Sequence, residues 1–205
     1  MDARQLLLDS HSWVHSHVAP SHIRWQIEES ICDGLTSAQI RYCPPQTHNS
    51  IAWLLWHMAR CEDVAVNTVL RGVTEVLDRE DWLARLGVSK RQIGTAETPA
   101  DVRRFSEQVD VAALRAYRAA VGQETHAWMS NVDFAVLTSA VTREEVQRAV
   151  ERETFGEQAE WVIEYWERGW TRGEFLSWLT TGHNYFHLGE AAMTRGLVLL
   201  SQDSL

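Results

Sequence analysis

Residues 49–63 read Asn-Ser-Ile-Ala-Trp-Leu-Leu-Trp-His-Met-Ala-Arg-Cys-Glu-Asp and begin the segment that decides the fold. Apolar side chains recur there every three or four positions, the spacing that gathers them on one face of an α-helix. The pattern predicts a long helix that starts at Asn49 or Ser50 and ends at Gly72. Its apolar stripe consists of Ile51, Leu54, Leu55, Met58, Ala65, Val66 and Val69.

The same helical period runs through almost the whole chain, and no stretch alternates for long with the two-residue period of a β-strand. Further long helices are predicted from Ala3 to about Val18, Ser21 to Asp33, Thr98 to Val132 with a restart near Asp110, and Thr171 to about Leu200. Capping pairs mark three helix starts, at Thr36 with Gln39, Thr142 with Glu145, and Thr171 with Glu174.

These elements predict an all-α fold, most simply a four-helix bundle with long crossover connections and extra short helices. The segment that joins the second and third bundle helices is longer than an antiparallel neighbour needs, so at least one crossover is expected. We expect residues 1–205 to form a single domain, with residues 1–20 as an N-terminal helical extension.

The composition is that of a packed globular chain, since 45% of the 205 residues are hydrophobic and 23% are charged. A formal net charge of -9 argues against a nucleic-acid partner. The longest apolar run, Ile51 to Trp56, is too short to cross a bilayer, so no membrane association is expected. Three cysteines, an odd number, and an N-terminus that does not resemble a signal peptide predict a cytoplasmic protein.

The last predicted helix carries two candidate metal ligands, His183 and His187. Their i, i+4 spacing puts both imidazoles on one face, where they can bind a single ion. A helical wheel places them at the edge of the core stripe beside Glu190, which could orient a ligand or accept a proton. The stripe comprises Phe175, Trp178, Leu179, Phe186, Met193, Leu197 and Leu200, with Gly182 and Gly189 in it to allow close approach of a neighbouring helix.

A third ligand has to come from another helix, and His57 is the candidate. It lies in the apolar arc of the 49–72 helix, so it is either a hydrogen-bonded core histidine or a ligand that faces His183 and His187. Three convergent imidazoles leave coordination positions open, which is the pattern of a catalytic ion. Such ligands suit zinc, nickel, cobalt or ferrous iron.

The remaining candidates have plainer interpretations. Cys61 is expected to be a small buried residue, and Glu62 is a weaker candidate for a contact behind the ligands. Trp53 and Tyr185 are expected in the core, where they would also line the mouth of the pocket. Surface positions are expected for Arg60 and Arg195, in salt bridges, and for His11, His15 and His17, on an exposed helix face.

Two of these segments resemble the DinB-like (DinB/YfiT) metalloenzyme superfamily. Residues 49–63 resemble its second helix. The sequence His183-Asn-Tyr-Phe-His187-Leu-Gly-Glu190-Ala-Ala-Met-Thr-Arg195-Gly196 resembles its last helix, especially in the mycothiol-transferase-like branch. That branch is also matched by Asp81-Trp82-Leu-Ala-Arg-Leu-Gly87, Gly94-Thr95 and Tyr117, so the resemblance covers roughly residues 22–200.

The resemblance implies a four-helix bundle with long crossovers and a metal triad of His57, His183 and His187. It also implies that the bound ion activates a low-molecular-weight thiol for transfer or isomerisation. In the related iron-binding sulfoxide synthases a glutamate follows the second histidine by two residues. Gly189 stands at that position here, which speaks against an iron oxygenase.

The leading hypothesis is therefore a divalent-metal-dependent enzyme, a thiol-dependent transferase or isomerase acting on a small electrophile, with Glu190 as its catalytic residue. The alternatives are a non-catalytic metal-binding or stress-associated protein, a metal-dependent hydrolase, and a bundle that encloses an apolar ligand. The expected partners are a small-molecule substrate and a second copy of the chain, because Trp-rich chains tend to expose tryptophans and the relatives are dimeric.

Overall fold

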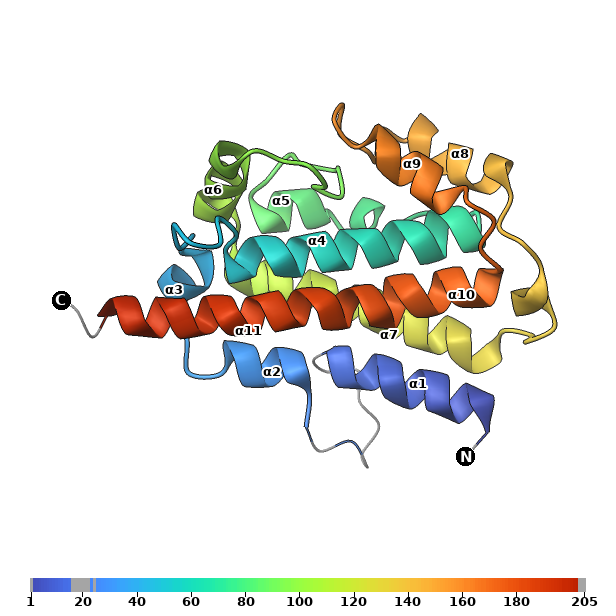
Figure 1. Ribbon diagram of the computed structural model, residues 1–205, viewed down its shortest axis with the longest axis horizontal. Helices are drawn as coiled ribbons and strands as arrows, with labels where there is room; N and C mark the ends of the chain where they lie inside the picture. Colours follow the sequence, from blue (N-terminus) through green and yellow to red (C-terminus); the bar gives the residue numbers. More distant parts are fainter. Residues whose placement is uncertain (1, 16–22, 24, 203–205) are drawn as a thin grey trace.

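The computed structural model describes residues 2–15, 23 and 25–202 and is all-α, as the sequence predicts (Figure 1). These residues contain no β-strand, only an isolated bridge between Ala140 and Thr171. The α-helices are α1 (Ala3–Val14), α2 (Ile27–Cys32), α3 (Ser37–Arg41), α4 (Ile51–Asp63), α5 (Trp82–Leu86), α6 (Pro99–Gln108), α7 (Val111–Asn131), α8 (Arg143–Glu151), α9 (Glu160–Trp166), α10 (Arg172–Ser177) and α11 (His183–Gln202). The short helical segments are the π-helical η1 (Val64–Leu70) and η4 (Trp178–Gly182) and the 3₁₀ turns η2 (Val76–Asp78) and η3 (Val136–Thr138).

The bundle is organised around α4, which contacts both α7 and α11. Helices α1 and α2 follow one another along α11 and complete the bundle (Figure 1). Residues 71–110 and 132–171 connect the long helices and carry the shorter ones, so the expected crossovers are confirmed. Helix α1 lies in the segment expected to be an extension, and it contacts α7, α11 and η4. His17 and the predicted helix limits at Val18 and Ser21 lie outside the described residues.

The predicted helix from Asn49 to Gly72 exists as α4 continued by η1. The Ser50 side chain caps its start by accepting a hydrogen bond from the Trp53 amide at 2.9 Å. Every residue from Ile51 to Leu70 is buried, so the helix is enclosed on all sides rather than along one stripe. The three predicted capping boxes, at the starts of α3, α8 and α10, are confirmed.

The predicted core stripe of the last helix is wrong beyond Leu179. Phe186 and Met193 are 69% and 58% exposed, whereas Leu188 and Ala191 are buried. The cause is η4, whose π-helical turn adds a residue relative to an α-helix and rotates everything that follows. The buried face therefore moves by about one position. Of the expected core residues on α11, Phe186, Met193 and Leu200 are exposed and Leu197 is half-buried.

The two glycines of that stripe do not serve the close helix approach that we expected. A Cβ atom on Gly182 would lie 2.6 Å from the indole of Trp178, so the missing side chain makes room for an aromatic ring of its own helix. A Cβ atom on Gly189 would meet no atom within 4 Å.

The expectation of surface salt bridges at two arginines is also wrong. Arg60 is buried and forms ion pairs with Asp63 at 3.2 Å and Glu75 at 2.8 Å, because the polar side chains of α4 are enclosed with the rest of that helix. Arg195 donates to the carbonyl oxygens of Ile31 at 2.6 Å and Asp33 at 2.8 Å, which ties α11 to the end of α2. Across the described segments, no helix combines the length and the apolar character that a bilayer crossing requires.

Candidate metal centre

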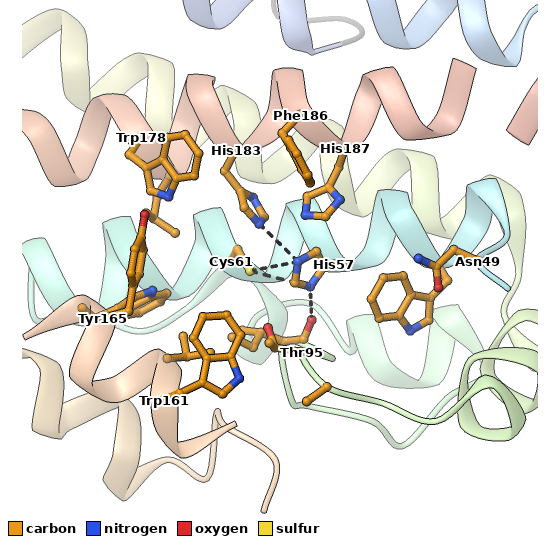
Figure 2. A pocket seen from close by; sticks show the side chains of 16 residues that line it. Asn49, His57, Cys61, Thr95, Trp161, Tyr165, Trp178, His183, Phe186 and His187 are labelled. Atoms are coloured by element: carbon orange, nitrogen blue, oxygen red, sulfur yellow. Dashed lines mark hydrogen bonds between the residues drawn. The ribbon is translucent and has the colours of Figure 1, made fainter. Parts of the chain in front are cut away.

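The three predicted ligands meet between α4 and the start of α11. His57 projects from the middle of α4, and His183 and His187 project toward it from successive turns of α11 (Figure 2). One ring nitrogen from each lies within 4.8 Å of the other two. The Nε2 atoms of His57 and His183 are 3.2 Å apart.

Two of the imidazoles are held by partners on the side away from this cluster. Nδ1 of His57 lies 2.6 Å from the carbonyl oxygen of Ile93, which can only accept, so His57 carries its proton on Nδ1 and keeps a lone pair on Nε2. Nδ1 of His187 faces Oε2 of Glu190 at 3.1 Å. Contacts of this kind orient metal-binding histidines and fix their tautomers.

The protonation of the cluster also suits a cation. Burial, together with the neighbouring His187, lowers the pKa of His57 to about 3. Burial and the imidazoles of His57 and His187 hold the pKa of His183 well below its usual value. Neutral imidazoles whose ring nitrogens converge repel one another unless a proton or a metal ion lies between them, so the donor set fits a divalent ion.

Glu190 lies behind His187 rather than in the open part of the site. Its second oxygen accepts a hydrogen bond from Asn49 Nδ2 at 2.6 Å, so both oxygens are engaged. Burial by itself would raise the pKa of Glu190, but the hydrogen bonds from His187 and Asn49 hold that pKa below its usual value. The carboxylate is therefore ionised and suited to orient the His187 ring.

Cys61 is buried as predicted, and its Sγ atom lies 3.8 Å from Nδ1 of His57. Burial raises the pKa of the Cys61 thiol far above its usual value. A thiol of this kind is a poor nucleophile, because the reactive form is the thiolate.

The histidines open into a cavity of about 480 Å³ whose wall is largely aromatic (Figure 2). Among the described residues that line it there is no lysine, arginine or carboxylate. The aromatic side chains of this wall are Trp53, Trp161, Tyr165, Trp166, Trp178 and Phe186.

The structure corrects the expected composition of this wall. Tyr185, which we expected in the core at the pocket mouth, is 37% exposed and does not line the cavity; Phe186 takes that place because η4 shifts the register of α11. Sequence reasoning also missed the contribution of α9. The signal was the aromatic spacing of residues 160–166, Glu-Trp-Val-Ile-Glu-Tyr-Trp, which places Trp161 and Tyr165 one turn apart.

A second cluster overturns the interpretation of the N-terminal histidines. His11 and His15 are fully buried, not exposed, because α1 turns this face toward α4. Their Nε2 atoms lie 2.9 Å and 2.7 Å from the two oxygens of Glu62. Glu62 therefore contacts α1 rather than the ligands of the first cluster, although Asn184, next to His183, donates to it at 3.2 Å.

Comparisons with known proteins identify a matching family and a similar solved structure. The sequence model of the DinB superfamily matches residues 22–191, a span that contains His57, His183, His187 and Glu190. Among solved structures, the chain is similar to a conserved protein from Enterococcus faecalis, with a TM-score of 0.70 and 19% identity over 97% of this chain and 98% of that one. At this identity the likeness shows the fold alone. No match is found among curated proteins.

Proposed function

Because the chain belongs to the DinB superfamily, we propose that it is a divalent-metal-dependent enzyme that transfers a small thiol to, or isomerises, a compact apolar electrophile. The observation that carries the proposal is the set of three imidazoles at the base of an aromatic cavity. The three free cysteines, Cys32, Cys43 and Cys61, suit the reducing cytoplasm as the place where the enzyme works.

Some residues of the chain would hold the metal ion, and others position those ligands or line the cavity. His57, His183 and His187 would hold the ion through nitrogen atoms. A bound divalent ion would lower the pKa of a thiol or a water molecule that it coordinates, which supplies a nucleophile at neutral pH. Glu190 and Asn49 fix the His187 ring, and Ile93 fixes the His57 ring. The tryptophans of the wall exclude water from the reacting groups.

The cavity lining favours one class of substrate. Since the described lining residues include no lysine, arginine or carboxylate, a substrate with several charges would find no charged side chain to pair with, apart from the bound ion itself. Flat apolar molecules can instead stack on Trp53, Trp161 or Trp178. The thiol has to come from outside the protein, because Cys61 is held in its unreactive protonated form.

The test is an assay of protein purified without chelator or affinity tag, with chlorodinitrobenzene as electrophile and mycothiol, glutathione or cysteine as thiol. In this reaction the thiol sulfur forms a bond to the ring carbon, chloride leaves, and the thiol proton passes to the buffer. Turnover should require both thiol and metal, disappear in His187→Ala and persist in Cys61→Ser.

Each alternative has its own outcome in the same experiment. Turnover lost in Cys61→Ser with metal retained would indicate covalent cysteine catalysis. Turnover of an ester substrate that needs metal but ignores added thiol would identify a hydrolase. Stoichiometric metal without turnover of any tested substrate would identify a non-catalytic metal-binding protein.

We also propose that the working form is a homodimer. The support is a row of apolar side chains on the outer face of α11, where Phe186, Met193 and Leu200 are 69%, 58% and 66% exposed. Exposed apolar surface of this kind is typical of a protein–protein contact.

A further inference from the structure

The contact between α1 and α4 is built from potential metal ligands. His11 lies in the last turn of α1 and His15 is the residue that caps its end, and each places Nε2 against a different oxygen of Glu62, at 2.9 Å and 2.7 Å. The three side chains are completely buried. One donor atom from each lies within 4.8 Å of the other two.

This contact is unusually polar for a buried helix interface. Taking a carboxylate out of water costs several kcal/mol unless a positive charge compensates for it. Among the described residues no lysine or arginine forms an ion pair with Glu62. The nearby Arg118 is paired with Glu28 at 2.6 Å. It approaches this region through hydrogen bonds to Asn184 and to the Val14 carbonyl oxygen, both at 2.9 Å, rather than through Glu62 itself.

The imidazoles leave further polar atoms unsatisfied. Nδ1 of His11 and Nδ1 of His15 are buried and have no hydrogen-bond partner, and the same holds for Nε2 of His126 on α7. The ring of His126 lies 6.1 Å from that of His11. A buried carboxylate without a lysine or arginine partner and the unpartnered Nε2 of His126 thus lie beside these two imidazoles. Apolar side chains would have packed there at lower cost.

We propose that His11, His15 and Glu62 bind a second divalent transition-metal ion, of the zinc type, that fastens α1 to α4. Two imidazoles and one carboxylate are a common donor set for zinc and ferrous iron. The donor atoms would have to separate by only about half an ångström to reach metal–ligand distances of about 2.0–2.2 Å. His126 is the nearest further imidazole for a fourth position.

This second site would differ in kind from the first. It shares no ligand with the His57, His183 and His187 cluster, and none of its residues lines the aromatic cavity. Complete burial leaves no position for a substrate, so the ion would be structural. His11 and His15 also precede residue 22, where the match to the superfamily begins, so the site would belong to this chain's own N-terminal helix.

The test counts ions by elemental analysis after zinc loading and removal of free metal. Wild-type protein should hold two ions per chain. Glu62→Gln and His15→Ala should each hold one, as should His183→Ala, and the double variant His15→Ala with His183→Ala should hold none. His48→Asn changes an exposed histidine outside both clusters and should keep two.

A second measurement keeps the proposal testable if His15→Ala folds poorly. Glu62→Gln is nearly isosteric, so it can be examined by circular dichroism and thermal unfolding with and without zinc. Zinc should raise the Tm of His183→Ala, which keeps the second site, but not that of the double variant Glu62→Gln with His183→Ala.

The ion counts test the two proposed sites independently. One ion in wild type that is lost in His183→Ala but kept in Glu62→Gln would overturn the second site and leave the proposed function intact; the cluster would then be a hydrogen-bonded contact only. One ion that is kept in His183→Ala but lost in Glu62→Gln would support the second site and remove the first.

Discussion

Among single residues, Glu190 is better placed to hold His187 than to move a proton. Both of its oxygens accept hydrogen bonds, one from His187 and one from Asn49. Burial raises the pKa of Glu190, but these two hydrogen bonds outweigh burial and keep the pKa below its usual value. A proton carrier works best with a pKa near the working pH and a free oxygen that faces the substrate. Glu190 could orient a ligand or accept a proton, and these contacts agree better with orienting His187.

The corresponding prediction concerns Glu190→Gln. Glutamine can still accept from His187 but loses the negative charge, so metal affinity should fall by about 10-fold to 100-fold. Turnover at saturating metal and the shape of the pH–rate profile should change little. Isothermal titration with zinc, beside kinetics at saturating metal, separates the two effects, and Glu157→Gln on an exposed loop is the matched control. Turnover that drops while metal affinity stays the same would instead assign proton transfer to Glu190.

Buried histidines make the metal-free protein sensitive to acid. Burial lowers the pKa of His15 to about 4, while the unfolded chain keeps a value near 6.5. Between those pH values the unfolded state binds more protons than the folded state. The stabilising contribution of neutral His15 is therefore fully present above about pH 6.5 and is lost as the pH drops toward 4. Titration of His15 should lower the free energy of unfolding by about 2 kcal/mol between pH 7 and pH 5.

Urea unfolding of chelator-treated protein at pH 7, 6 and 5 measures this loss. His15→Gln, which cannot titrate, should show a flatter dependence on pH than the wild type. If the unfolding free energy depended on pH equally in the two proteins, His15 would not be the source of the acid sensitivity.

At the scale of one helix, η4 decides which side chains face the core. Gly182 belongs to this π-helical segment and leaves room for the Trp178 indole, whereas Gly189 on α11 borders open space. Gly182→Ala should therefore displace the indole and cost about 1–3 kcal/mol of unfolding free energy. Gly189→Ala should stabilise by up to about 1 kcal/mol, because alanine favours helix and nothing obstructs it.

Chemical denaturation of the two variants measures both values. Since Trp178 lines the cavity beside His183, Gly182→Ala should also change the intrinsic tryptophan fluorescence. If both substitutions were to stabilise the protein equally, the close contact with Trp178 would not exist.

This helix also shows where sequence reasoning succeeds and where it stops. The i, i+4 spacing of His183 and His187 survives because both residues follow η4, and His57 could be found because its helix has a regular apolar period. The π-helical turn leaves no trace in the apolar spacing, so Phe186 and Tyr185 were assigned to the wrong faces. His11 and His15 were misplaced for another reason: burial of a histidine depends on the carboxylate that faces it, here Glu62, which comes from another helix.

For the molecule as a whole, the outer face of α11 determines how two copies can meet. Phe186 and Met193 are one heptad apart, so they lie on the same face, and both are more than half exposed. A two-fold dimer brings the same patch of each copy together, so the two Met193 side chains should lie close to one another across the axis. Replacing them by carboxylates would place like charges in a desolvated contact, which costs several kcal/mol.

Sedimentation at micromolar concentration should therefore find a dimer for the wild type and a monomer for Met193→Glu. Val136→Glu introduces the same charge at another exposed apolar position, on η3, and should remain dimeric. Phe186 belongs both to this face and to the wall of the cavity, so dissociation should also raise the KM for an apolar electrophile while metal content stays the same. A monomeric wild type, or a Met193→Glu variant that stays dimeric, would show that α11 does not form the contact.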